Sequence, residues 1–292
     1  MPLCDPPVVA EVPTETTRHP VPRPGAVGGS WRRLGELVWL LAVTDFRRRF
    51  AQTALGRLWL VIGPLLFFGV VYLFVSEIIE RLVGVVPNFA VLLLLNLSLY
   101  TFFRNGAGNG MTSLTGGGGL VRKMPMPRLA LPAATILSAG FVLAGNLVVT
   151  VIWIVASGVD PRWTWLLLPV LLLWLVVVTS SFALLVSGVY VFLRDVSQIW
   201  GVIGRIGFYV SPILYPIQVV PKKVLYDALS FNPLAPVFAQ TQTWLINAQA
   251  PSWFGSKGWG VMAFMPFIVL AVISVAGVLT FRQGARRVAE QL

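Results

Sequence analysis

The chain has almost none of the side chains that soluble enzymes use for chemistry. Its 292 residues include one cysteine, Cys4, and one histidine, His19. A disulfide within the chain is therefore impossible, and a site built from several His or Cys ligands is excluded. Charged residues make up 11% of the sequence, whereas a soluble domain has about 25%. A chain so poor in charge is predicted to lie in a solvent other than water.

Two further absences concern the source of energy. No G-x-x-x-x-G-K-[ST] phosphate loop occurs, so the chain is not expected to hydrolyse ATP by itself. None of the eleven acids lies inside a long apolar run, whereas ion-coupled transporters generally keep carboxylates at membrane depth. Transport by this chain would therefore need energy from another polypeptide. No close Asp pair is present either, so we expect no catalytic residue, metal site or cofactor in the chain itself.

Long runs without a charged residue are abundant. Crossing a hydrocarbon core of about 30 Å takes roughly 20 helical residues. Five runs reach that length, at residues 58–76, 82–103, 129–159, 163–193 and 258–281. A sixth run is interrupted only by an arginine, and it covers residues 196–221. Because backbone polar groups in lipid must be paired within the chain, we predict an all-α integral membrane protein. Its six transmembrane helices would occupy residues 58–281.

Positive charge is distributed unequally between the predicted loops. One side would carry thirteen cations: Arg32, Arg33, Arg47, Arg48, Arg49, Arg57, Arg122, Lys123, Arg128, Arg194, Arg282, Arg286 and Arg287. The other side would carry five: Arg81, Arg162, Lys222, Lys223 and Lys257. The positive-inside rule then places both termini in the cytoplasm. The net charge of +11 follows from this topology and from contact with anionic lipids, so no nucleic-acid partner is expected.

The segments outside the six runs have their own predicted roles. Residues 1–30 contain seven prolines and no apolar signal-peptide core, which predicts a disordered cytoplasmic tail. Residues 31–57 have apolar side chains at helical spacing between arginine clusters, which predicts an amphipathic interface helix. The outer loop has apolar pieces at 219–229 and 234–245 that are too short to cross, so we expect short re-entrant helices there. Residues 282–292 would form a cytoplasmic tail.

A cationic segment with several prolines separates the second and third apolar runs. Its sequence is GGGGLVRKMPMPRLALP, from residue 116 to residue 132. Prolines end one helix and begin the next, and cations keep the segment out of the bilayer. By itself the segment is compatible with an ordinary positive-inside loop or with a docking segment for a cytoplasmic partner.

Four motifs, in order along the chain, resemble those of a known family. They are DFRRRFAQTALGRLWLVIGPLL at 45–66, LVRKMPMPRLALP at 120–132, FLRDV at 192–196, and YVSPILYP with NPLAP at 209–216 and 232–236. Together they resemble the permease subunits of polysaccharide ABC exporters, the Wzm-type exporters of O-antigen, teichoic acid and galactan. The similarity covers about residues 31–285. The chain departs from the family at the four glycines 116–119, where bulkier polar residues are more usual.

The resemblance implies a transporter subunit, not an enzyme, in a bacterial inner membrane. It implies a homodimer that binds two copies of a cytoplasmic nucleotide-binding ATPase, which would hold ATP and Mg. The implied substrate is a glycan on a polyprenyl pyrophosphate carrier. The residues implied at a coupling helix and its ATPase interface are Arg122, Lys123, Pro125, Pro127, Arg128, Arg194 and Asp195. Those implied at short outer gate helices are Pro212, Pro216, Asn232 and Pro233.

Aromatic residues and two arginines near membrane depth are candidates for the substrate path. Sugar faces stack on aromatic rings, although interfacial belts and helix packing also use such residues. The aromatic candidates are Tyr72, Tyr100, Phe102, Phe103, Phe208, Tyr209 and Tyr215. Arg104 and Arg205 are costly at membrane depth, and a guanidinium binds phosphate with two hydrogen bonds, which suits a pyrophosphate group. Snorkelling to the inner interface is the alternative, above all for Arg205.

Two other functions remain open from the sequence. A permease of a related drug or lipid ABC exporter is compatible with the same absences. A membrane-embedded glycolipid enzyme, such as a polyprenyl-sugar transferase, would need a catalytic acid or base near the membrane, and the eleven acids offer little. Co-purification with an ATPase separates the two ABC hypotheses from the enzyme.

Overall fold

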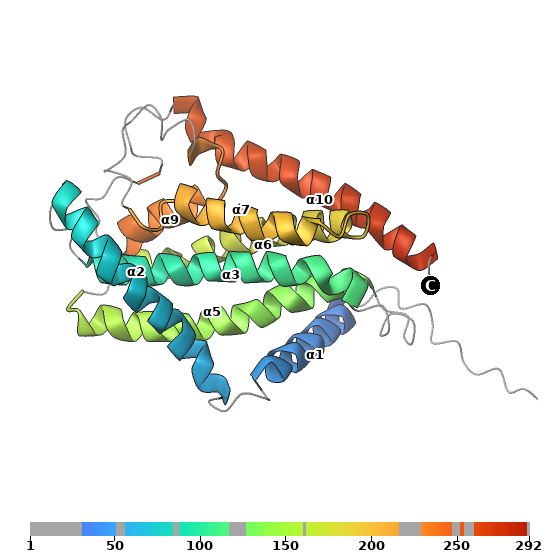
Figure 1. Cartoon of the computed structure of the whole chain (residues 1–292), viewed down its shortest axis with the longest axis horizontal. Helices are drawn as coiled ribbons and strands as arrows, with labels where there is room; N and C mark the ends of the chain where they lie inside the picture. Colours follow the sequence, from blue (N-terminus) through green and yellow to red (C-terminus); the bar gives the residue numbers. More distant parts are fainter. Residues whose placement is uncertain are drawn as a thin grey trace, which may run out of the picture.

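The protein is helical throughout the part that its computed structural model describes (Figure 1). The described residues are 31–50, 56–83, 88–116, 127–159, 162–215, 229–246, 252–253 and 260–290. The helices are α1 (Trp31–Phe50), α2 (Trp59–Val83), α3 (Phe89–Gly116), α5 (Ala130–Ala156), α6 (Leu168–Tyr190), α7 (Val196–Val210), α9 (Ala235–Thr241) and α10 (Met265–Glu290). Short helical turns join several of them, at Gly56–Leu58, Trp163–Leu167, Gln242–Ile246 and Gly260–Phe264. The predicted all-α class is confirmed.

Within these described residues, five helical stretches are long and apolar enough to cross a membrane. They are Ile62–Arg81, Phe89–Gly116, Ala130–Ala156, Trp163–Tyr190 and Met262–Arg287. All five correspond to predicted spans. The remaining one, predicted at 196–221, is helical only along α7, whose 15 residues reach about 22 Å at roughly 1.5 Å each. At Ser211 the backbone becomes extended, with ψ of 145°, so the sixth crossing stays a prediction.

The second span is displaced from its predicted place. Instead of residues 82–103 it occupies Phe89–Gly116. Asn88, with a positive φ of 55°, precedes the helix, and its carbonyl accepts hydrogen bonds from the backbone N–H groups of Val91 and Leu92. At the other end α3 continues three turns past Arg104, because that side chain is exposed beside a cavity and does not have to end the helix. Arg104 therefore lies in the middle of the helix.

Helix α3 is the central helix of the bundle, and it packs against α5 and α6. Two of its glycines allow α6 to approach closely. A Cβ at Gly106 would lie 2.7 Å from Thr179 Cγ2, and a Cβ at Gly110 would lie 2.8 Å from Ala183 Cβ. In a bilayer, association of helices depends on such close van der Waals packing, because lipid is as apolar as the side chains. These glycines therefore set the spacing between α3 and α6.

Hydrogen bonds between pairs of side chains connect helices inside the bundle. The Thr241 hydroxyl donates to Asn96 Oδ1 over 2.8 Å, which connects α9 to α3. The Ser181 and Ser274 hydroxyls lie 2.8 Å apart and connect α6 to α10. Each such bond contributes about 1 kcal/mol in a membrane protein, so they assist the packing and do not replace it.

The first helix lies against α5. Phe141 of α5 makes edge-on ring contacts with Trp39, at 5.3 Å between ring centroids, and with Phe46, at 5.6 Å. Arg49 pairs with Asp45 one turn earlier, at 2.8 Å. The predicted interface helix is therefore helical over Trp31–Phe50, and its position at the membrane surface stays a prediction.

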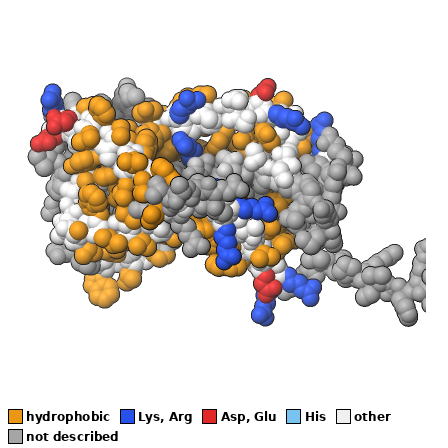
Figure 2. All heavy atoms as spheres, turned by 60° about the horizontal axis from the view of Figure 1, so that its bottom comes forward, with side chains coloured by type: hydrophobic (Ala, Val, Ile, Leu, Met, Phe, Trp, Pro, Cys, Tyr) orange, Lys and Arg blue, Asp and Glu red, His pale blue; other side chains and the backbone are white. Residues whose placement is uncertain are grey.

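The outer surface of the bundle is apolar. Large hydrophobic side chains of α2 are exposed, with Leu73 70% and Phe74 71% accessible, and α5, α7 and α10 expose similar residues. On the face drawn in Figure 2, hydrophobic side chains cover most of the left part, and Lys and Arg lie mainly toward the middle and right. A membrane protein exposes such a surface to lipid, so this distribution agrees with several spans.

The turns between helices gather at two ends of the bundle. At one end, Arg128 before α5 donates to the Ala285 carbonyl of α10, and the Arg287 guanidinium lies 5.0 Å from the Phe192 ring centroid. This is the end that the charge distribution predicts to be cytoplasmic. At the other end, Trp165 Nε1 before α6 donates to the Leu245 carbonyl over 3.2 Å. The helices therefore run from one end to the other, as spans must.

Candidate functional site

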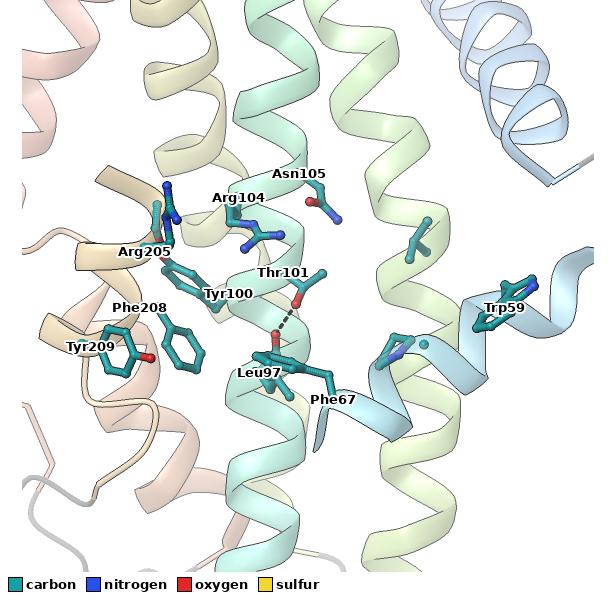
Figure 3. Close-up of a pocket in the computed structure, with 14 residues that line it drawn as sticks. Trp59, Phe67, Leu97, Tyr100, Thr101, Arg104, Asn105, Arg205, Phe208 and Tyr209 are labelled. Carbon is teal, nitrogen blue, oxygen red and sulfur yellow. Dashed lines mark hydrogen bonds between the residues drawn. The ribbon is translucent and has the colours of Figure 1, made fainter. Parts of the chain in front are cut away.

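A cavity of about 480 Å³ lies between α2, α3, α5 and α7. This is within the size range of ligand sites in proteins. Five of its lining residues are aromatic: Trp59, Phe67, Tyr100, Phe208 and Tyr209. We call it the aromatic cavity, and Figure 3 shows these rings arranged on either side of α3, together with Arg104 and Arg205.

A second cavity, of about 380 Å³, adjoins the first further along α3 toward Gly116. It shares three lining residues with the aromatic cavity, namely Arg104, Asn105 and Arg205. Its remaining lining residues are Gly108, Asn109, Trp200 and Gly201. We call it the donor cavity, because the arginine, asparagine and tryptophan side chains among its lining residues carry N–H groups. The two cavities form one groove between α3 and α7.

The contact between α3 and α7 is fixed by Tyr100 and by glycines. The Tyr100 hydroxyl donates to the Gly204 carbonyl over 2.5 Å. A Cβ at Gly204 would come within 3.3 Å of the Arg104 side chain, and a Cβ at Gly207 within 3.0 Å of the Tyr100 hydroxyl. Phe208 packs on Tyr100, with 5.5 Å between ring centroids. The glycines of α7 therefore make room for the long side chains of α3 that line the groove.

The electrostatics of the groove are positive. Neither cavity has an acidic lining residue. The ion pairs found among the described residues join Arg32 to Glu36, Arg49 to Asp45 and Arg81 to Glu77. The Arg104 and Arg205 side chains take part in none of them. Arg205 Nε donates to the Gly201 carbonyl of its own helix over 3.1 Å, which leaves the outer guanidinium nitrogens free to bind an anion.

The structure brings together five of the residues predicted for the substrate path. Tyr100, Arg104, Arg205, Phe208 and Tyr209 all line the aromatic cavity. They come from two helices that the sequence separates by about a hundred residues. Their arrangement depends on the α3–α7 contact, which no local motif encodes.

The other four predicted aromatic residues lie elsewhere in this chain. Phe103 is buried and packs edge-on against Phe182 at 5.2 Å, and Phe102 belongs to the same core. Tyr72 stacks between Phe68 and Phe89 on α2 and α3. The Tyr215 hydroxyl donates to the Val210 carbonyl over 3.0 Å. Successive helical residues point about 100° apart, so neighbours of Tyr100 and Arg104 face other helices.

The predicted coupling and gate residues are only partly described. Arg122, Lys123, Pro125 and Pro216 lie outside the described residues. Pro127 and Arg128 lie at the start of α5, and Arg194 and Asp195 are exposed in the turn before α7. At the opposite end Pro212 and Pro233 are buried, and Asn232 Nδ2 donates to the hydroxyl of Ser211 over 2.8 Å. This bond places the two predicted gate motifs, YVSPILYP and NPLAP, next to each other.

Several lining residues were not identified from the sequence. Trp59 and Phe67 form the α2 wall of the aromatic cavity, and Asn105, Asn109 and Trp200 line the donor cavity. Asn105 and Asn109 are four residues apart, so they share a face of α3. That pattern could have indicated a polar face inside a span, but it lies past the charge-free run that ended at residue 103.

The comparisons with known proteins agree with this architecture. The ABC-2 type transporter family matches residues 36–243, a range that includes both cavities. Two O-antigen export system permease proteins RfbA of Klebsiella pneumoniae are 26% and 24% identical to the chain over 263 residues, which is 89% of this chain and 97% of each relative. The RfbA protein of Myxococcus xanthus is 23% identical over 238 residues, 80% of this chain and 85% of the relative.

The family match covers most of the chain, and the helices and cavities described above lie within or beside it. A transporter of this kind binds and moves its substrate without changing it, which agrees with the scarcity of acids. The chain therefore belongs to the ABC-2 type transporter family, as a membrane-spanning transporter subunit and not an enzyme.

Proposed function

We propose that the chain is the permease subunit of an ATP-driven exporter that moves a lipid-linked polysaccharide out of a bacterial cell. The observation that carries the proposal is the groove between α3 and α7. It joins aromatic rings to two arginines without an acidic partner, beside α3, a helix long and apolar enough to span a membrane. The relatives are named as O-antigen export permeases, which agrees with a glycan substrate.

Each part of such a substrate has a chemical match in this groove. Sugar rings present C–H groups that pack on aromatic faces, and Tyr100, Phe208 and Tyr209 offer such faces on one side of the cavity. A diphosphate is anionic and accepts hydrogen bonds, which suits the guanidinium groups of Arg104 and Arg205. A polyprenyl chain is apolar, and the outer surface of α2 beside the cavity exposes large apolar side chains. A small apolar drug would need no such cationic groove.

The homodimer and the ATPase are part of the proposal. Tyr209 is 67% exposed, and the groove is open on one side, so a second copy of the chain would close a path between two grooves. The exposed cations at one end of the bundle, Arg194, Arg286 and Arg287, suit docking to a cytoplasmic ATPase. Arg122, Lys123 and Pro125 would belong to the same docking surface. ATP and Mg would be bound by two copies of that partner, since this chain has no phosphate loop.

Depletion of the chain in its native host tests the proposal. We expect a lipid-linked glycan to accumulate on the cytoplasmic side, and the surface glycan to be lost. The full chain should co-purify with a phosphate-loop ATPase, and the chain alone should show no ATPase activity. A depleted strain with normal surface glycan but altered sensitivity to drugs would instead favour a drug exporter. A catalysed change in the glycolipid by the chain alone would favour an enzyme.

A further inference from the structure

We propose that Asn146 holds an ordered water molecule in a small polar cavity between α1, α3 and α5, and that this water bridges Asn146 to Asn105 at the wall of the groove. The polar cavity is separate from the aromatic and donor cavities and lies where α3 meets α5. The inference does not depend on the proposed function, because it follows from the size of the cavity and from the side chains that line it.

The polar cavity has room for one water molecule. Its volume is about 20 Å³, and on the same measure a single water needs at least about 10–15 Å³ and two to four polar partners. Five lining residues are polar, and they come from three helices: Arg49 of α1, Ser98, Thr101 and Asn105 of α3, and Asn146 of α5. The space is far too small for a sugar or a phosphate, so water is the ligand that fits.

Asn146 is the residue that most needs a partner. It is 4% exposed, on a helix apolar enough to span a membrane. Its backbone carbonyl accepts from the Thr150 hydroxyl over 2.8 Å, but its side-chain amide makes no hydrogen bond within the described part of the chain. An amide that is buried without a partner costs free energy, so proteins seldom leave one in that state.

The Asn146 amide borders the cavity and is not sealed in the packing. Among the described residues, the sealed side-chain polar atoms without a partner belong to Asn109, Ser138, Ser187, Trp200 and Gln240. The amide atoms of Asn146 are not among them, and Asn146 lines the polar cavity. A water in the cavity could therefore reach both the donor and the acceptor of this amide.

The two hydroxyl groups in the cavity can complete the site. The Ser98 hydroxyl donates to the Leu94 carbonyl over 2.8 Å, and the Thr101 hydroxyl donates to the Leu97 carbonyl over 2.7 Å. Each hydroxyl has used its one proton, but its oxygen can still accept a hydrogen bond. A water that accepts from the Asn146 amide can donate to these oxygens, which gives it the partners that a buried water needs.

The charges favour water over an ion. No residue that lines the polar cavity is acidic, and Arg49 brings a positive charge that disfavours a cation. The Arg49 guanidinium pairs with the Asp45 carboxylate at 2.8 Å, so the pair has little net charge to hold an anion. A neutral ligand that both donates and accepts suits such surroundings.

Asn105 connects this cavity to the groove. It lines the polar, aromatic and donor cavities. Figure 3 shows Asn105 and Thr101 on the side of α3 nearer α5, whereas Tyr100 lies on the side nearer α7. The Asn105 amide makes no hydrogen bond to another described residue, so direct contacts do not fix its orientation. A water between Asn146 and Asn105 would fix it.

X-ray radiolytic footprinting of the full chain in lipid nanodiscs tests the water directly. The beam makes hydroxyl radicals from water in place, so a side chain beside a bound water is oxidised even where bulk solvent cannot reach. Phe102 is 4% exposed and lines the polar cavity, whereas Phe103 is 6% exposed and packs against Phe182, outside all three cavities. We expect Phe102 to be oxidised several times faster than Phe103. Equal rates would overturn the proposal.

Two buried serines give a matched pair of variants. Ser98 is 2% exposed and lines the polar cavity, whereas Ser138 of α5 is 0% exposed and lines none of the three cavities. Ser98→Ala removes an acceptor and should slow the oxidation of Phe102, and Ser138→Ala should not. Asn146→Leu should lower it to the rate of Phe103. The serine pair keeps the test decisive if Asn146→Leu does not fold, and unchanged oxidation in the folded variants would reject the site.

Thermal unfolding tests the bridge to Asn105. Two residues that share a bound water are coupled although they are not bonded to each other, so the Tm shifts of Asn146→Leu and Asn105→Leu should not add in the double variant. Those of Asn146→Leu and Ser138→Ala should add. Additive shifts for the asparagine pair would reject the bridge. Non-additive shifts without excess oxidation of Phe102 would indicate direct packing and reject the water. Neither measurement depends on export, so failure of the proposed function would leave both outcomes readable.

Discussion

Gly106 and Gly110 on α3 face α6, whereas Gly108 and Asn109 on the same helix line the cavity beside α7. On the first face the neighbouring side chains approach to 2.7 and 2.8 Å from the positions where Cβ atoms would lie. On the second face the same stretch of helix borders a cavity of about 380 Å³ that Arg104 and Arg205 also line. Adjacent residues of one helix thus lie in a tight contact and in an open groove.

The two faces of α3 are therefore expected to have different roles, one in stabilising the fold and the other in contacting substrate. Between membrane helices, small residues and close contact provide the stabilising energy, and lipid provides no hydrophobic gain. The α6 side of α3 satisfies that requirement. The α7 side has polar and charged groups that are costly in a membrane and are retained where they bind something. We therefore expect substitutions on the α6 side to affect folding and those on the α7 side to affect transport.

The largest effect is expected on the packed face. Gly110→Val should remove most folded protein, because its side chain would overlap Ala183 Cβ, and overpacking costs about 1–3 kcal/mol or more. The measurement is the yield of monodisperse protein and its thermal unfolding. Gly145→Val, at a position with open space, should retain wild-type yield. Equal yields of the two variants would contradict the tight contact.

The next effect is expected in the open groove. Replacing both arginines, Arg104→Gln with Arg205→Gln, should leave unfolding unchanged and lower export at least tenfold, since charged hydrogen bonds contribute roughly 1.5–3 kcal/mol. Export is measured as surface glycan per folded chain. The control is Arg81→Gln, which breaks an exposed pair with Glu77 at 3.6 Å and should change neither quantity. Normal export in the double variant would reject a role for the arginines.

A matched pair of phenylalanines gives a smaller contrast. Phe103→Leu lies in the packed core and should lower stability by about 1 kcal/mol with normal export per folded chain. Phe208→Leu lies in the aromatic cavity and should reduce export more than it reduces stability. Unfolding and export assays on both proteins separate the two effects. If Phe103→Leu instead reduced export and Phe208→Leu mainly reduced stability, the substrate path would not lie on the α7 side of α3.

The smallest effect concerns the contact that closes the groove. Tyr100→Phe removes the hydroxyl that donates to the Gly204 carbonyl and keeps the ring. A typical hydrogen bond contributes about 1 kcal/mol, so unfolding should shift only slightly. Hydrogen exchange of α7 should increase, because the bond connects it to α3. Tyr72→Phe, in the α2 stack, is the control and should leave α7 exchange unchanged.

The sequence predicts the spans well because lipid makes simple demands on composition. The runs at 129–159 and 163–193 contain α5 and α6, and the run at 258–281 contains the greater part of α10, which continues to Glu290. The α3 span is misplaced, because a span defined as a charge-free run ends at the first charged side chain. Arg104 faces a cavity, so it can remain inside the helix, and neither the cavity nor its neighbour α7 is visible in a local pattern.

The candidate site was predictable only in part for the same reason. Arg104 and Arg205 stand out because charge is rare near membrane depth, and Tyr100 and Phe208 because sugar stacks on rings. Trp200 does not stand out, because tryptophan is common in membrane proteins. Its place beside Gly108 and the donor cavity depends on the packing of α7 on α3, which no local pattern encodes.

The central claim is that substrate passes along the α7 side of α3, and photo-crosslinking in glycan-producing cells tests it directly. A photoreactive amino acid would replace Phe208 or Tyr209 in the groove, and Val272 of α10, which is 63% exposed and lines neither cavity, as the control. The account predicts crosslinks to the lipid-linked glycan at positions 208 and 209, but none above background at 272. Crosslinks of equal strength at position 272, or none at 208 and 209, would contradict it.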